Sequence, residues 1–112
     1  MNYENQVCVD ACTSCFAICS YCADQCLEKD GMEKCVRHCL DCLEICQTMA
    51  SLAARGSQNL GAVAAACAEI CDACADECEK LGSDHCKACA EACRKCAEEC
   101  RKLADAHARK AA

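Results

Sequence analysis

The chain has 112 residues and a formal net charge of −6, with acidic and basic residues interspersed along it. This length suits one compact domain, so we expect residues 1–112 to form a single unit. The charge pattern excludes a nucleic-acid partner, which would require a clustered basic face. Aromatic residues make up 3% of the chain and proline is absent, whereas cysteine supplies 19 residues. Sulfur must therefore replace many of the bulky side chains of an ordinary core.

The sequence also bears on the compartment. The N-terminal residues lack a basic region followed by an apolar one, so no secretory signal is visible. No stretch approaches the roughly 20 consecutive apolar residues of a membrane span. We therefore expect a cytoplasmic protein without a membrane partner. Thiols stay reduced in the cytosol, so this cysteine-rich pattern indicates metal binding rather than disulfides. The odd count of 19 also excludes complete pairing within the chain.

Four helices are predicted in chain order, at residues 3–29, 32–54, 58–80 and 84–109. The first ends at Gly31, which suits a left-handed C-terminal cap. Gly56 and Gly82 end the second and third helices in the same way. The serines that follow, Ser57 and Ser83, are expected to cap the third and fourth helices with their hydroxyl groups.

The cysteines follow one pattern in all four segments. Within a segment every step between cysteines is three or four residues, and each segment contains the unit C-x3-C-x2-C-x3-C. Such steps place the sulfurs of a segment on one stripe of a helix. Aliphatic residues such as Ile18, Leu43 and Ile70 flank the stripes. Short turns make consecutive helices antiparallel. We therefore predict an all-α, antiparallel up-down-up-down four-helix bundle with a cysteine-lined core.

The charge of the metal distinguishes the candidates. Zinc prefers four thiolates, which leaves about −2 per site in a dry core. Cu(I) is soft, binds two or three sulfurs and carries one positive charge. One Cu(I) per thiolate therefore keeps the core neutral, as do protons on buried thiols. Iron–sulfur clusters fit less well, because their cysteines lie in loops rather than at helical spacing. The sequence therefore favours multiple Cu(I) ions per chain.

The predicted ligands are the cysteines of the four stripes, together with a methionine and a histidine that continue two stripes at the end of the bundle near the termini. They are Cys8, Cys12, Cys15, Cys19, Cys22, Cys26, Cys35, Cys39, Cys42, Cys46, Cys67, Cys71, Cys74, Cys78, Cys86, Cys89, Cys93, Cys96, Cys100, Met49 and His107. Because thioether and imidazole groups can pass Cu(I) to thiolates, we expect metal to enter at that end. At the other end, His85 directly precedes Cys86 and could join a terminal cluster, although a solvent-facing cap is the favoured expectation.

The fourfold C-x3-C-x2-C-x3-C unit on a proline-free chain resembles the bacterial four-helix-bundle copper storage proteins, from Cys8 to Cys100. The resemblance implies storage of many Cu(I) ions on cysteine ligands inside the bundle. It also implies a homotetramer, and possible copper donor or acceptor proteins as partners. Without an export signal, the chain is similar to the cytosolic branch of that family.

Two other functions remain open at this stage. One is a zinc or cadmium sink built from the same thiolates. The other is a thiol redox protein, which would need an exposed cysteine of low pKa beside a basic residue. We find no paired carboxylates, no nucleophile with its base and no phosphate-binding loop. The sequence therefore predicts no catalytic residue, no organic cofactor and no enzyme activity.

Overall fold

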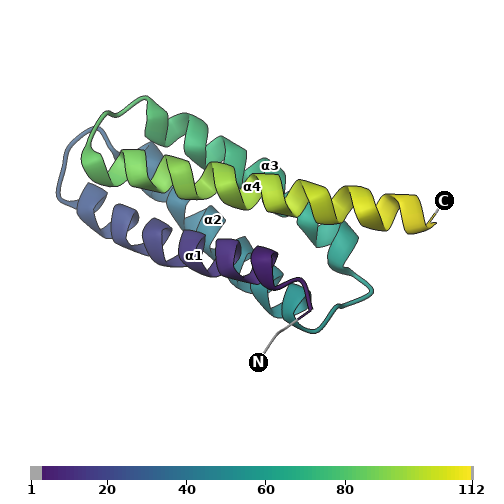
Figure 1. The fold of residues 1–112 in the computed structure, drawn as a ribbon. Coiled ribbons are helices and arrows are strands. Elements are labelled where there is room, and N and C mark those ends of the chain that lie inside the picture. Colours follow the sequence, from purple (N-terminus) through teal and green to yellow (C-terminus); the bar gives the residue numbers. More distant parts are fainter. Residues whose placement is uncertain (1–3, 112) are drawn as a thin grey trace.

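The structure is a computed structural model that describes residues 4–111, with side chains described for residues 4–109. It contains the helices α1 (Gln6–Leu27), α2 (Glu33–Ala54), α3 (Leu60–Glu79) and α4 (Asp84–Ala111). Figure 1 shows them as a bundle of roughly parallel and antiparallel rods. The prediction of an all-α four-helix bundle is confirmed.

Each helix packs against its two neighbours in the bundle: α1 against α2 and α4, and α3 against α2 and α4. The turns of residues 28–32 and 80–83 lie together at one end, which we call the paired-turn end (Figure 1). The opposite end holds the turn of residues 55–59, the start of α1 and the last part of α4. We call it the single-turn end. The stripes of cysteines run between these two ends.

The turn glycines behave as predicted, but the serines do not. Gly31, Gly56 and Gly82 adopt positive φ angles of 83°, 61° and 75°, which glycine tolerates without a steric penalty. The Ser57 hydroxyl accepts a hydrogen bond from the backbone N–H of Asn59 at 3.1 Å, and the helix begins only at Leu60. Ser83 precedes α4, yet its buried hydroxyl has no hydrogen-bond partner. The predicted serine caps are therefore wrong in detail.

Helix α1 begins later than predicted, at Gln6, and residue 3, the expected start, lies outside the described residues. Asn5 precedes the helix with a φ of 52°, a left-handed conformation that breaks the helical path. Its side-chain amide donates a hydrogen bond to the Ala53 carbonyl oxygen at 3.2 Å. The start of α1 is thereby fastened to the end of α2. The other helix ends differ from the expected ones by two residues or fewer.

The interior is made mainly of sulfur. All 19 cysteines are free thiols, and each is 3% exposed or less. Aliphatic and aromatic residues between the helices, among them Phe16, Ile18, Leu43 and Ile70, are half-buried and pack against this core. The predicted division into a cysteine seam and an aliphatic collar is confirmed.

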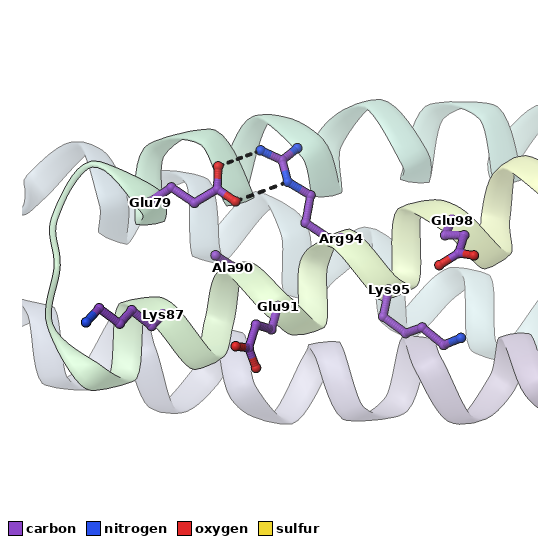
Figure 2. A pocket seen from close by; sticks show the side chains of 7 residues that line it. All are labelled: Glu79, Lys87, Ala90, Glu91, Arg94, Lys95 and Glu98. Atoms are coloured by element: carbon purple, nitrogen blue, oxygen red, sulfur yellow. Dashed lines mark hydrogen bonds and ion pairs between the residues drawn. The ribbon is translucent and has the colours of Figure 1, made fainter.

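The outer face of the α3–α4 pair is charged. Arg94 on α4 forms ion pairs with three carboxylates of α3, at 2.9 Å to Asp72, 2.6 Å to Asp76 and 2.7 Å to Glu79. Figure 2 shows Arg94 reaching across to Glu79 above a surface hollow of about 560 Å³. Charged side chains and Ala90 line this hollow, and no cysteine does. It is a feature of the surface, separate from the sulfur core.

Helix α1 is long and apolar enough to cross a membrane when only length and composition are considered, with a mean hydropathy of 1.3 over its most apolar window. Six cysteines of the helix contribute to that value, and all six are buried inside the bundle. In this fold the apolar character of α1 is therefore used to line the core.

Candidate metal centre

Within each helix, the sulfurs meet in C-x3-C pairs. Residues four apart on a helix lie on the same face, one turn from each other. The pairs with Sγ–Sγ distances of 3.8–4.0 Å are Cys8–Cys12, Cys15–Cys19, Cys22–Cys26, Cys42–Cys46, Cys67–Cys71, Cys89–Cys93 and Cys96–Cys100. Such pairs occur on all four helices, so each helix offers ready two-sulfur sites.

Sulfurs from different helices approach equally closely. Between α1 and α4, Cys12 lies 3.5 Å from Cys96. Between α2 and α3, Cys42 lies 3.5 Å from Cys71. Diagonal contacts also cross the axis of the bundle from α2 to α4, with Sγ–Sγ distances of 3.7–3.8 Å for Cys39–Cys89, Cys42–Cys93 and Cys46–Cys96. The four stripes therefore merge into one column of sulfur.

Groups of four sulfurs, all within 4.8 Å of one another, succeed each other along this column. They include Cys12–Cys67–Cys96–Cys100, Cys15–Cys46–Cys71–Cys96, Cys15–Cys19–Cys42–Cys93, Cys19–Cys74–Cys89–Cys93 and Cys22–Cys35–Cys39–Cys78. Neighbouring groups share members: Cys96 joins the first two, Cys15 the next two, and Cys19 with Cys93 the following two. A metal ion can therefore pass between adjacent sites by exchanging one ligand at a time.

Burial and hydrogen bonding between thiols shift the pKa values of the cysteines. Burial raises the pKa of Cys26 and Cys35. A thiol hydrogen bond with Cys100 raises the pKa of Cys12, whereas hydrogen bonds from Cys100 and Cys12 lower that of Cys8 to about 5. A thiol with a raised pKa holds its proton at neutral pH. A monovalent metal that displaces this proton leaves the charge of the core unchanged.

The paired-turn end has a histidine directed at the sulfurs. His85 Nδ1 lies 3.5 Å from Cys22 Sγ, 3.6 Å from Cys86 Sγ and 3.9 Å from Cys26 Sγ. Its other ring nitrogen, Nε2, lies 3.4 Å from Lys29 Nζ. The favoured expectation of a solvent-facing cap is therefore wrong, and the contacts fit the alternative in which His85 joins a terminal cluster. It is half-buried, and the first turn of α4 lets its ring lie over the end of the sulfur column.

The single-turn end is closed by apolar side chains. Met49, Ala53, Leu60 and Ala64 are each 0% exposed and belong to the same core cluster as the cysteines. The Met49 thioether thus continues the stripe of α2, as predicted from the sequence. These four side chains therefore pack as in an ordinary protein core, although Cys8 at the same end is 3% exposed.

His107 lies further along α4 and packs against α3. A Cβ on Gly61 would lie 2.8 Å from the His107 Cβ, so glycine is what allows the two helices to approach here. His107 is half-buried beside a surface hollow lined by Gly61, Ala62 and Ala65. Among the described side chains it makes no hydrogen bond to a cysteine. The structure thus does not bring His107 to the sulfurs.

Three comparisons with known proteins agree with this geometry. The family model for copper storage proteins matches residues 1–105. A cysteine-rich protein of Bacillus subtilis, YhjQ, is 37% identical over 90 residues, which cover 78% of this chain and 83% of that protein.

Solved structures match over nearly the whole chain. The Cu(I)-bound copper storage protein Csp3 of B. subtilis superimposes with a TM-score of 0.85 at 38% identity, covering 90% of this chain and 98% of the other. The copper storage protein Ccsp of Streptomyces lividans, loaded with 10 copper equivalents, has a TM-score of 0.86 at 35% identity, covering 91% and 84% of the two chains.

Proposed function

Because the chain belongs to the copper storage protein family, we propose that it stores multiple Cu(I) ions on cysteine thiolates inside its helix bundle. The observation that carries this proposal is the unbroken column of 19 buried sulfurs whose four-membered groups share cysteines. Sulfurs shared between neighbouring sites suit an ion that is content with two or three ligands.

The same sharing counts against a zinc or cadmium sink. A tetrahedral divalent ion prefers four thiolates, which leaves about −2 per unshared site in the core. Groups that share Cys15, Cys93 or Cys96 could all hold divalent ions only through bridging thiolates, and the 19 cysteines would then hold fewer ions than one Cu(I) per thiolate allows. A role as a thiol redox protein is equally poorly supported, because every cysteine is buried.

The proposed ligands are the 19 cysteines, with His85 added at the paired-turn end on the strength of its three contacts with sulfur. Met49 stays in the set because it is buried in the same cluster, whereas His107 is left out because no hydrogen bond links its described side chain to a cysteine. We further propose that copper enters at the paired-turn end. This replaces the expectation from the sequence that it enters near Met49 and His107.

The proposed setting is the cytosol, supported by the likeness to a cytosolic copper storage protein of S. lividans. The family resemblance also supports a homotetramer, which sedimentation equilibrium on the metal-free and loaded protein would test. No proposal of catalysis is made, since the buried thiols and the family both favour storage.

The test is an anaerobic titration of the fully reduced protein with Cu(I), in competition with a coloured Cu(I) chelator. We expect tight uptake that approaches one copper per cysteine with little change in helicity. Saturation at four or five metal ions, or displacement of copper by zinc, would instead establish a tetrathiolate site for divalent ions.

A further inference from the structure

A small hollow leads from the surface to the end of the sulfur column. It has a volume of about 220 Å³ and lies along the turn between α1 and α2, lined by Cys26, Leu27, Lys29, Asp30, Glu33, Val36 and Arg37. Cys26 is itself only 1% exposed, and it is the one cysteine among the residues that line the hollow. The hollow is thus a place where a ligand could come against a residue of the sulfur column.

Cys26 is connected directly to the rest of the column. Its sulfur lies 3.8 Å from Cys35 Sγ, and 4.0 Å from both Cys22 Sγ and Cys86 Sγ. His85 Nδ1 is 3.9 Å away. A copper ion received by Cys26 therefore has four other ligand atoms within reach and can move inward without returning to water.

The rim of the hollow carries charges of both signs. Lys29 and Arg37 supply two cations, and Asp30 and Glu33 supply two carboxylates, while Leu27 and Val36 add apolar surface. All four charged residues are exposed. The two carboxylates would attract bare Cu⁺ as much as the two cations repel it, so the rim as a whole does not favour the bare ion. Charges of both signs do suit a carrier that has carboxylates and an amino group of its own.

We propose that this hollow receives Cu(I) as its complex with a small anionic thiol, and that Cys26 is the first acceptor. The proposal rests on the proposed function. The carboxylates of the carrier would pair with Lys29 and Arg37, and an amino group would pair with Asp30 or Glu33. The volume of about 220 Å³ is below that of a typical site for a drug-sized ligand, so the hollow fits a short thiol rather than a protein domain.

The transfer is a ligand exchange without a redox step. The Cys26 sulfur forms a bond to Cu(I) while the bond between copper and the carrier sulfur breaks. The proton of the Cys26 thiol passes to the departing thiolate, which leaves as a neutral thiol group. Copper stays monovalent throughout, and the charge of the core is unchanged.

The experiment measures initial loading rates at low ionic strength from the Cu(I)–glutathione complex, which is anionic, from the Cu(I)–cysteamine complex, which is cationic, and from Cu(I) in acetonitrile. The variant is Arg37→Gln and its matched control is Arg55→Gln. Both arginines are exposed, and they lie at opposite ends of α2. From the Cu(I)–glutathione complex we expect Arg37→Gln to load about threefold more slowly than the wild type, whereas its rates from the other two Cu(I) sources should not change. The control Arg55→Gln should match the wild type with all three sources. Equal rates for the two variants would overturn the proposal.

A second pair of variants tests the acceptor. Cys26 and Cys8 are the last and first cysteines of the α1 stripe, at opposite ends of the column. Replacing either by serine removes one ligand and should lower the capacity for copper, but Cys26→Ser should slow the initial rate of loading from Cu(I)–glutathione roughly tenfold more than Cys8→Ser does. Equal slowing in both variants would exclude Cys26 as the first acceptor.

The number of Cu(I) ions bound at equilibrium, measured with Cu(I) in acetonitrile, distinguishes a failure of the proposed delivery site from a failure of the proposed copper storage. Normal capacity with identical rates in all variants would refute the delivery site alone. A wild-type capacity of only a few ions would refute copper storage itself.

Discussion

The two ends of the sulfur column differ in what covers them. At the single-turn end, Leu60 and Met49 lie over the last cysteines and are completely buried, and Asn5 fastens the start of α1 to the end of α2. At the paired-turn end, the column meets a half-buried histidine and a hollow that reaches Cys26. One end has apolar side chains packed beside its last cysteines, and the other has an imidazole in contact with three sulfurs and a hollow lined by charged residues.

This difference teaches that a symmetric sequence repeat need not give a symmetric function. All four helices carry the same cysteine unit, yet the residues just beyond the cysteines differ between the two ends, and the proposed place of metal exchange follows from that difference. With a single place of exchange, the sites near Cys26 would fill and empty first, and those near Cys8 last. Three substitutions test the contrast between the ends.

The largest effect is expected from Leu60→Ala at the single-turn end. Removing a fully buried leucine side chain leaves a cavity and lowers the free energy of unfolding by about 2–5 kcal/mol. Urea denaturation of the reduced, metal-free protein, followed by circular dichroism, measures the loss. Leu103→Ala is the control, because Leu103 is only half-buried and should cost less. Equal losses would show that Leu60 is not part of a closed, well-packed end.

The next effect concerns the paired-turn end. His85→Ala removes the imidazole that faces Cys22, Cys26 and Cys86. We expect the initial rate of Cu(I) loading to fall about tenfold, the change produced by about 1.4 kcal/mol. Stopped-flow mixing with Cu(I) in acetonitrile measures this rate. The matched variant His107→Ala should load at the wild-type rate, and a slower rate in that variant would move the entrance to the other end.

The smallest effect is expected at Asn5, whose side chain bonds to the end of α2 at the single-turn end. Asn5→Ala removes the hydrogen bond to the Ala53 carbonyl and places a Cβ-bearing residue without a polar side chain at a φ of 52°. The free energy of unfolding should fall by about 1 kcal/mol. Asn5→Gly loses the same hydrogen bond but tolerates the backbone angle, so it should lose less. A larger loss in the glycine variant would contradict this account.

Much of the fold could be predicted because one signal dominates the sequence. Steps of three and four between cysteines specify four stripes, and the glycines at positions 31, 56 and 82 mark the turns. Facing stripes can only meet if the helices pack around them. The fold and the burial of every cysteine therefore followed from spacing alone, and the structure confirms both.

The position of His85 could not be derived in the same way. One residue along a helix turns the side chain by about 100°, and the spacing left open whether His85 joins a terminal cluster or caps the end toward solvent. In the first turn of α4 there is no preceding turn to block the ring, and its Nδ1 reaches three sulfurs. The serine caps failed for a related reason, since the turns around Ser57 and Ser83 satisfy the helix ends through backbone groups. The sequence signal for both was local, whereas the outcome depended on packing at the ends of the bundle.

The burial of all 19 sulfurs behind the helices has a consequence for recognition. Each Cu⁺ that replaces a proton leaves the net charge as it was, and the outer faces of the helices, with their ion pairs around Arg94, do not touch the cargo. An empty molecule and a full one would therefore look alike to any protein that reads the sides of the bundle. If copper is exchanged at the paired-turn end, as proposed, a partner that collects copper would have to contact that end of each molecule to distinguish a full one from an empty one.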